Sequence, residues 1–143
     1  MTKKYKVGYT QGVYDMFHIG HLNLLQQAAK HCEKLIVGVN SDTLVYEYKK
    51  HYPIISETDR AAIISGLKCV YEAHIVHTLD KEEILKDHPF DAIFIGDDWK
   101  GNARWKDTEE IMTKYGVEIE YLPYTKGVSS TELRERILKM TDK

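Results

Sequence analysis

The chain has 143 residues, a formal net charge of −2 and 43% hydrophobic residues. These values favour one domain, spanning residues 1–143, and speak against a nucleic-acid-binding protein that depends on a basic surface. No stretch approaches the roughly 18 apolar residues of a membrane span, and the N-terminal sequence MTKKYKVGYT lacks the apolar region of a signal peptide. We therefore expect a cytoplasmic protein with neither nucleic-acid nor membrane partners.

Short apolar runs alternate with helical patterns along the chain. In chain order, strands are predicted at residues 5–10, 34–39, 73–77, 91–96 and 117–122. Helices are predicted at 19–31, 57–67, 81–88 and 107–115, and at 133–140 after a capping box of Ser129 with Glu132. Residues 43–56 fit neither period and are expected to form a loop. This order predicts an α/β fold: one Rossmann-like, doubly wound, five-stranded parallel sheet with helices on both faces.

Polar residues follow four of the five predicted strands directly. These groups are residues 10–21, 40–42, 96–99 and 124–131. In an open parallel sheet, ligands bind outside the carboxyl ends of the strands. The four groups are therefore expected to meet in one crevice. The two cysteines, Cys32 and Cys69, have no metal or redox spacing and are expected to be reduced thiols.

The first group contains two histidines, in the sequence His18-Ile19-Gly20-His21. A metal site is the weaker interpretation, because zinc needs three or four ligands and this motif supplies two. Two ordinary surface histidines are a second possibility. A phosphate site explains the position best, because the first turn of a helix favours anions, imidazoles can donate to phosphate, and Gly20 allows close approach.

The other groups each have a plain and a functional interpretation. Lys49 and Lys50 form a basic run that is either solvated or a phosphate-binding lid, whereas Arg60 and Lys68 alone indicate only surface charge. Asp97 and Asp98 could cap a turn or accept hydrogen bonds from a base or ribose. The hydroxyls of residues 129–131 could cap a helix or bind a second phosphate.

Neither a P-loop nor a dinucleotide-binding glycine motif is present in the sequence, and no nucleophile elbow is present. Phosphate donors without an evident base suit the attack of a phosphate on the α-phosphate of a nucleotide. Such an attack needs no base, because the second pKa of a phosphomonoester is about 6. Positioning and charge stabilisation would then provide the catalysis.

The sequence HIGH resembles the H-x-G-H signature of the nucleotidyltransferase superfamily, which class I aminoacyl-tRNA synthetases share. The longer stretch GVYDMFHIGHLNLLQQA looks most like the cytidylyltransferases. GDDW followed by LPYTKGVSST is similar to the glycerol-3-phosphate cytidylyltransferases, whose corresponding region reads RTEGISTT. KKHYPIISETDR resembles the phosphocholine enzymes, in which a lysine ten residues before the arginine faces the phosphates. The resemblance covers residues 5–138.

This resemblance implies a CTP-dependent cytidylyltransferase that uses Mg²⁺, forms a homodimer and makes a CDP-activated precursor of the kind used for cell-surface polymers. The metal ligands stay open. The implied catalytic residues are His18, His21 and Lys50. The implied nucleotide-binding residues are Thr10, Gly12, Val13, Asp15, Gly20, Asp97, Asp98, Trp99, Gly127, Ser129, Ser130 and Thr131, with Asp15 supporting the loop. The implied acceptor-binding residues are Lys49, Arg60, Lys68, Tyr124 and Lys126.

Three departures from the family pattern concern the acceptor. Tyr124 and Lys126 stand where the family has arginine and glutamate, and Lys68 replaces another arginine. Lysine does not replace the bidentate phosphate contact of arginine. Glycerol 3-phosphate is the first choice of acceptor; phosphocholine, phosphoethanolamine or a phosphorylated amino-acid derivative are alternatives. An adenylyltransferase and a non-catalytic nucleotide-binding module also remain possible.

Overall fold

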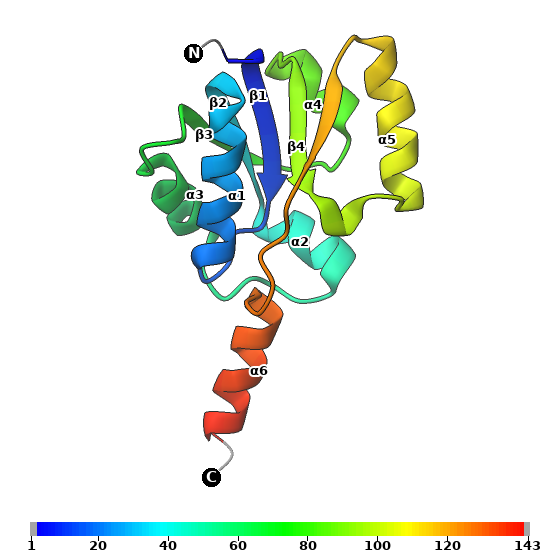
Figure 1. Cartoon of the computed structure of the whole chain (residues 1–143). Helices are drawn as coiled ribbons and strands as arrows, with labels where there is room; N and C mark the ends of the chain where they lie inside the picture. The colour runs from blue at the N-terminus through cyan, green and yellow to red at the C-terminus, as the bar shows by residue number, and fades with distance from the viewer. Residues whose placement is uncertain (1–2, 142–143) are drawn as a thin grey trace.

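The computed structural model describes residues 3–141, which form one parallel sheet flanked by helices (Figure 1). The elements in chain order are β1 (Tyr5–Gly12), α1 (Ile19–Lys30), β2 (Cys32–Asn40), α2 (Asp42–Lys49), α3 (Glu57–Ser65), β3 (Glu72–Val76), α4 (Lys81–Asp87), β4 (Ala92–Gly96), the 3₁₀ turn η1 (Asp97–Trp99), α5 (Ala103–Lys114), β5 (Glu118–Leu122) and α6 (Ser130–Thr141). The sheet order is β3-β2-β1-β4-β5. This arrangement confirms the predicted doubly wound α/β fold.

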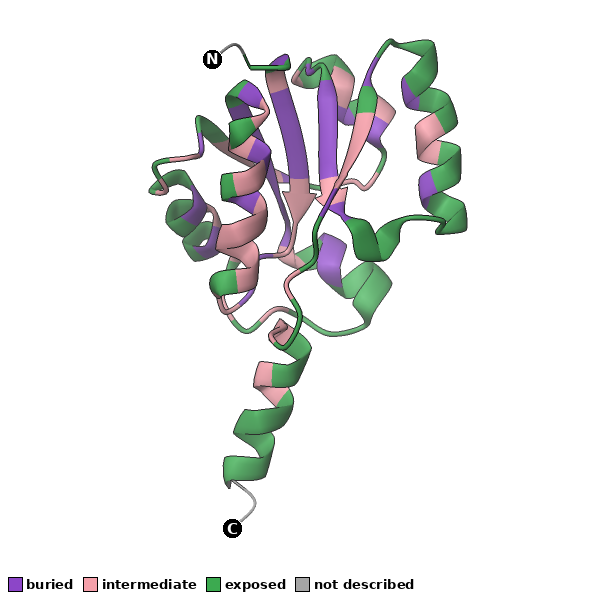
Figure 2. Cartoon of the chain, viewed as in Figure 1, coloured by how far each residue is buried: buried purple, intermediate pink, exposed green. Residues whose placement is uncertain are grey.

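The sheet is covered on both faces, as the continuous apolar strands predict. On one face, α1 and α3 contribute Leu25, Ala28 and Ile64 to a core layer with the strands. On the other face, α4 and α5 contribute Ile84 and Met112 to a second layer. Figure 2 shows the burial concentrated in the central strands, whereas α6 projects from the body and is largely exposed.

The chain direction across the sheet reverses at β1. Strands β1, β2 and β3 follow one another towards one edge, and β4 then pairs with the other side of β1. The crevice at such a switch point, beyond the carboxyl ends of β1 and β4, is the expected ligand site of this architecture. Among the described residues, no helix combines the length and the hydrophobicity needed to cross a bilayer.

Two predicted boundaries were wrong. Residues 43–56 were expected to form a loop, but 42–49 form α2, which Ser41 caps by accepting a hydrogen bond from the amide of Leu44. Only Leu44 and Val45 of this short helix are buried, so its apolar period is too weak to detect. The predicted helix at 107–115 begins earlier, as α5, because Asn102 caps it and Trp105 is buried.

Candidate active site

A cavity of about 320 Å³ lies beyond the carboxyl ends of β1, β4 and β5. Its walls come from the β1–α1 loop, the first turn of α1, the end of α2, and the segment leading into α6. We call it the histidine cavity because His18 and His21 line it. Three of the four predicted groups, in residues 10–21, 96–99 and 124–131, therefore meet here, together with residues from 45–53. The predicted group 40–42 does not line this cavity.

The two histidines form the N-terminal cap of α1. The amide of Gly20 donates to Nδ1 of His18 (3.1 Å), and the amide of His18 donates to Nδ1 of His21 (3.2 Å). The two rings stack, with their centroids 3.7 Å apart. A side chain on Gly20 would have its Cβ 3.0 Å from the His18 ring, which is tighter than almost all such contacts. Glycine therefore allows the ring to fold back onto the helix end.

This cap fixes the tautomers of both histidines. Because each Nδ1 accepts a backbone hydrogen bond, the proton of each neutral ring is on Nε2. Burial lowers the pKa of His18, and it lowers the pKa of His21 to about 3, with the charge of His18 adding to the effect. Both rings are therefore neutral near pH 7, and each has one N–H left to donate to a ligand.

Asp15 joins three segments around the cavity. Its side chain is buried and accepts from the amides of Ile54 (2.8 Å) and Ile55 (2.9 Å) in the segment after α2. Its backbone carbonyl accepts from Oγ of Ser130 (2.6 Å), and Arg134 lies 3.8 Å from its carboxylate. These contacts place the hydroxyls at the start of α6 beside the histidines, so Asp15 organises the site.

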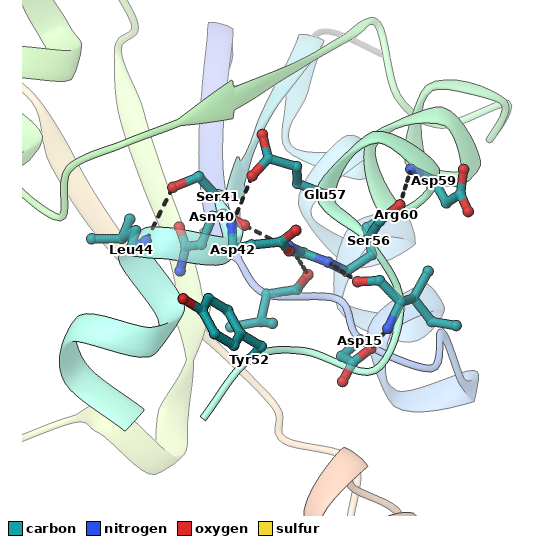
Figure 3. A network of polar contacts seen from close by, with 12 residues as sticks. Asp15, Asn40, Ser41, Asp42, Leu44, Tyr52, Ser56, Glu57, Asp59 and Arg60 are labelled. Atoms are coloured by element: carbon teal, nitrogen blue, oxygen red, sulfur yellow. Dashed lines mark hydrogen bonds and ion pairs between the residues drawn. The ribbon is translucent and has the colours of Figure 1, made fainter. Parts of the chain in front are cut away.

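Arg60 is a structural residue, which corrects its predicted role in acceptor binding. Its side chain is fully buried and donates to the carbonyls of Val13 (2.7 Å), Asn40 (2.8 Å) and Ile55 (2.8 Å). It also forms an ion pair with Asp42 (2.6 Å), as Figure 3 shows. The guanidinium ties the ends of β1 and β2 to the segment before α3 and has no exposed surface for an acceptor.

The structure places Lys49, rather than Lys50, on the histidine cavity. Lys50 has a left-handed backbone (φ 63°) at the end of α2, and its ammonium donates to the carbonyl of Glu47 (2.9 Å). This conformation turns its side chain back along the helix, so Lys50 does not line the cavity, and its catalytic role stays a prediction. Partial burial lowers the pKa of Lys49, and the nearby Arg134 lowers it further. Lys49 is thus the lysine positioned to meet a phosphate.

Lys68, Lys126 and Thr10 do not contact the histidine cavity either. Lys68 is exposed in the segment that leads into the amino end of β3. It therefore lies at the edge of the sheet opposite to the histidine cavity, which is at the carboxyl ends of the strands. Lys126 is exposed and outside the cavity lining, as is Gly127, whose positive φ (86°) forms the turn before α6. Thr10 is buried, and its hydroxyl donates to the carbonyl of Phe94 (2.9 Å), joining β1 to β4.

The remaining predicted residues do come together. Those on the cavity wall are Gly12, Val13, Asp15, Gly20, Trp99, Tyr124, Ser129, Ser130 and Thr131. Asp97 accepts from the amide of Tyr124 (3.2 Å), which joins η1 to the segment after β5. Asp98, next to Asp97, is an exposed residue overall, but partial desolvation of its carboxyl group raises its pKa. These two carboxylates border the cavity at η1 without forming its wall.

Residues 9–136 match the family model described as cytidylyltransferase-like. The glycerol-3-phosphate cytidylyltransferase of Bacillus spizizenii (strain ATCC 23059 / NRRL B-14472 / W23) is 33% identical over 131 residues, covering 88% of this chain and 92% of the relative.

The chain belongs to the cytidylyltransferase-like family.

This cytidylyltransferase-like chain is also similar to a part of a longer relative and to a protein of solved structure. The bifunctional protein HldE of Hyphomonas neptunium is 34% identical over 138 residues, but this alignment spans 92% of the chain and only 27% of the relative. The crystal structure of a lipopolysaccharide core biosynthesis protein from Thermoplasma volcanium superposes with a TM-score of 0.71 at 27% identity, covering 87% of this chain and 99% of that one. The protein is a nucleotidyltransferase by family.

Sequence reasoning missed one cation of this cytidylyltransferase-like site. Arg134 lines the histidine cavity from the second turn of α6. It lies four residues after Ser130, which is one helical turn and hence the same face. Because Ser130 had been predicted as a phosphate ligand, this spacing was a signal that could have identified Arg134.

Proposed function

We propose that the protein transfers CMP from CTP to a small phosphorylated acceptor, with glycerol 3-phosphate as the first choice, and releases pyrophosphate. The observation that carries this proposal is one cavity lined by two neutral imidazoles, each with an Nε2–H left to donate, by hydroxyls of α6 and by the cations Lys49 and Arg134. The family match and the name of the Bacillus spizizenii relative support the nucleotide and the acceptor class.

In this reaction, an oxygen of the acceptor phosphate forms a bond to the α-phosphorus of CTP. The bond from that phosphorus to the oxygen bridging to the β-phosphorus breaks, and this oxygen leaves with pyrophosphate. No base is needed, because the acceptor phosphate is already largely a dianion at neutral pH. His18 and His21 would donate to the oxygens that gain negative charge as the bond breaks, which is where fixed donors are most effective.

The leaving pyrophosphate needs its own donors. Ser129 and Thr131 line the same cavity from the start of α6 and have hydroxyl hydrogens to donate, whereas Ser130 donates its hydrogen to the carbonyl of Asp15. The N-terminus of this helix adds a favourable dipole. Lys49 and Arg134 bring positive charge from two other elements. We therefore assign the β- and γ-phosphates to the α6 side of the histidine cavity.

Mg²⁺ is proposed to arrive with CTP. Among residues 3–141, no cluster of three or more histidine, cysteine, aspartate or glutamate side chains could hold a metal ion, and the carboxylate of Asp15 is occupied by two backbone amides. Magnesium commonly binds through substrate phosphates and water rather than through a protein cage. None of the steps above is assigned to the ion.

The test is a pyrophosphate-release assay with CTP, ATP, GTP or UTP against glycerol 3-phosphate, ribitol 5-phosphate, phosphocholine, phosphoethanolamine and phosphorylated amino-acid derivatives. Release that requires both CTP and one acceptor is the expected result. Release with ATP in place of CTP would instead indicate an adenylyltransferase. Tight CTP binding without release for any acceptor would contradict the proposed reaction and favour a nucleotide-binding module.

A further inference from the structure

A second cavity of about 250 Å³ opens from the histidine cavity, between the ends of β2 and β4 and the starts of α4 and α5. The two share a wall that includes Gly12, Val13 and Lys49. We call the second cavity the Trp105 pocket. The lining residues that distinguish it from the histidine cavity include Asn40, Tyr48, Lys81, Arg104 and Trp105. Nothing in the proposed handling of CTP uses these five residues.

Lys81 is the least expected residue in the Trp105 pocket. Its side chain is buried, and its ammonium has one hydrogen bond, to the carbonyl of Leu79 (2.9 Å). The ammonium lies 5.4 Å from the centre of the Trp105 ring. Among the described residues, no carboxylate lies within ion-pair distance of it. A buried cation in this state is costly unless an anion joins it.

The surroundings of Lys81 are positive. Burial, and to a smaller extent the guanidinium of Arg104, lower its pKa to about 8 against the opposing charge of Asp80. Asp80 is exposed and occupied as the cap of α4, where it accepts from the amides of Glu82 and Glu83. The lining of the Trp105 pocket includes three cations, Lys49, Lys81 and Arg104, and none of its lining residues that the structure describes is acidic.

Two neutral donors also lack partners for their hydrogens. Nε1 of Trp105 is buried and has no hydrogen-bond partner within residues 3–141. The hydroxyl of Tyr48 accepts from Nδ2 of Asn40 (3.1 Å), and its own hydrogen remains free to donate. A buried N–H without a partner is rare in folded proteins and suggests a ligand or water that completes it. Together with the cations, these donors describe a site for a small oxyanion.

The position of the Trp105 pocket fits the second substrate. In phosphoryl transfer the attacking and leaving oxygens lie roughly in line, on opposite sides of the phosphorus. Pyrophosphate is assigned to the α6 side of the histidine cavity. The described lining of the Trp105 pocket has no residue from 123–134, and it extends instead towards the starts of α4 and α5, across the shared wall. An acceptor in this pocket would therefore approach the α-phosphate from the side opposite to the leaving group, with Lys49 between them.

We propose that the Trp105 pocket binds the acceptor, and that the acceptor is a purely anionic phosphate ester whose phosphate contacts Lys81, Arg104 and the indole N–H of Trp105. This inference rests on the proposed function and narrows its substrate class. A phosphate ester that carries an ammonium group would place a like charge among three cations without a carboxylate to offset it. Phosphopolyols are therefore accepted, and phosphocholine and phosphoethanolamine are rejected.

The first experiment measures binding without turnover. Calorimetric titration of the full chain at pH 7 with glycerol 3-phosphate and with phosphocholine should show at least about tenfold tighter binding of glycerol 3-phosphate. Arg104→Gln, at an exposed position, and Lys81→Met should each weaken glycerol 3-phosphate binding by about tenfold or more, since charged hydrogen bonds are the strong ones. Lys86→Met, on the exposed side of α4, is the matched control and should bind as the wild type does.

Trp105→Phe keeps the ring and removes only the N–H, so it should weaken glycerol 3-phosphate binding by about threefold to tenfold. Circular dichroism checks that each variant folds, and if Lys81→Met does not fold, Arg104→Gln decides. Equal affinity for phosphocholine, no binding of glycerol 3-phosphate to the wild type, or unchanged affinity in folded Arg104→Gln and Lys81→Met proteins would each overturn the inference.

The second experiment separates this inference from the proposed function. In the pyrophosphate-release assay, Arg104→Gln should raise KM for glycerol 3-phosphate by about tenfold and leave KM for CTP unchanged. If phosphocholine is used as efficiently as glycerol 3-phosphate, the reaction stands and the acceptor class is wrong. If glycerol 3-phosphate binds the Trp105 pocket with the expected dependence on Lys81 and Arg104, but no nucleotide supports pyrophosphate release, the proposed function is wrong instead.

Discussion

Replacing His21 by glutamine separates the two tasks that the structure assigns to this histidine. Nδ1 of His21 accepts from the amide of His18 and thereby caps α1, whereas Nε2–H is free to donate to CTP. Glutamine is a favoured residue at this third helical position, where its side-chain oxygen caps the helix in the same way. His21→Gln should therefore keep the helix cap and replace the imidazole N–H by an amide N–H, which is less acidic and hence a weaker donor to the reacting phosphate.

The magnitude follows from the number of donors lost. Removing one fixed donor to a developing negative charge typically lowers kcat by roughly 100- to 1,000-fold, or about 3–4 kcal/mol. The affinity for CTP should change by less than about threefold, because the donor acts mainly on charge that appears in the transition state. His21→Ala should show the same loss of kcat and, in addition, about 1 kcal/mol lower stability, because the amide of His18 loses its partner.

Three measurements decide this prediction: steady-state pyrophosphate release, calorimetric titration with CTP, and urea unfolding. His88→Gln is the matched control, since His88 ends α4 at the opposite edge of the sheet and should leave kcat unchanged. A folded His21→Ala enzyme with kcat within threefold of the wild type would refute the proposed donor. A loss of CTP affinity as large as the loss of kcat would show that His21 binds the ground state instead.

The remaining predictions concern stability and the lysines. The pKa of His21 is lowered to about 3 in the folded protein, whereas a histidine in the unfolded chain titrates near 6.5. The unfolded chain therefore binds more protons below about pH 6.5, and the free energy of unfolding falls as the pH falls. Urea unfolding should show that, between pH 7 and pH 5, the wild type loses about 2 kcal/mol more stability than His21→Gln. Arg60→Met leaves three carbonyls and a carboxylate without their partner. It should therefore lower the free energy of unfolding in urea by about 3–5 kcal/mol. A loss below about 1 kcal/mol would contradict the structural role of Arg60. Lys49→Met should weaken CTP binding by about tenfold in calorimetry, whereas Lys50→Met should have little effect, and the reverse order would restore the role predicted from sequence. Lys68→Met should leave both kcat and stability unchanged, within error, in the same assays.

The sequence by itself determined the fold class and predicted the edge of the sheet at which the candidate site lies. The alternation of apolar runs with helical periods predicts a doubly wound parallel sheet, because each period reports which face of an element is buried. The polar residues that follow the strands, His18 and His21 above all, are placed at one edge by the parallel direction of the strands alone. Both inferences use local patterns and one general rule of topology, so they need no knowledge of side-chain packing.

Only the tertiary structure decided which charged residues lie at the candidate site. Arg60 is buried because carbonyls 20 and 47 positions away in the sequence accept its hydrogens, and no local pattern predicts such partners. Lys49 and Lys50 are neighbours in sequence, but the left-handed end of α2 sends them in different directions. Lys81 joins Trp105 because α4 and α5 cover the same face of the sheet. Burial of a charge depends on contacts between distant segments, which exist only once the chain has folded.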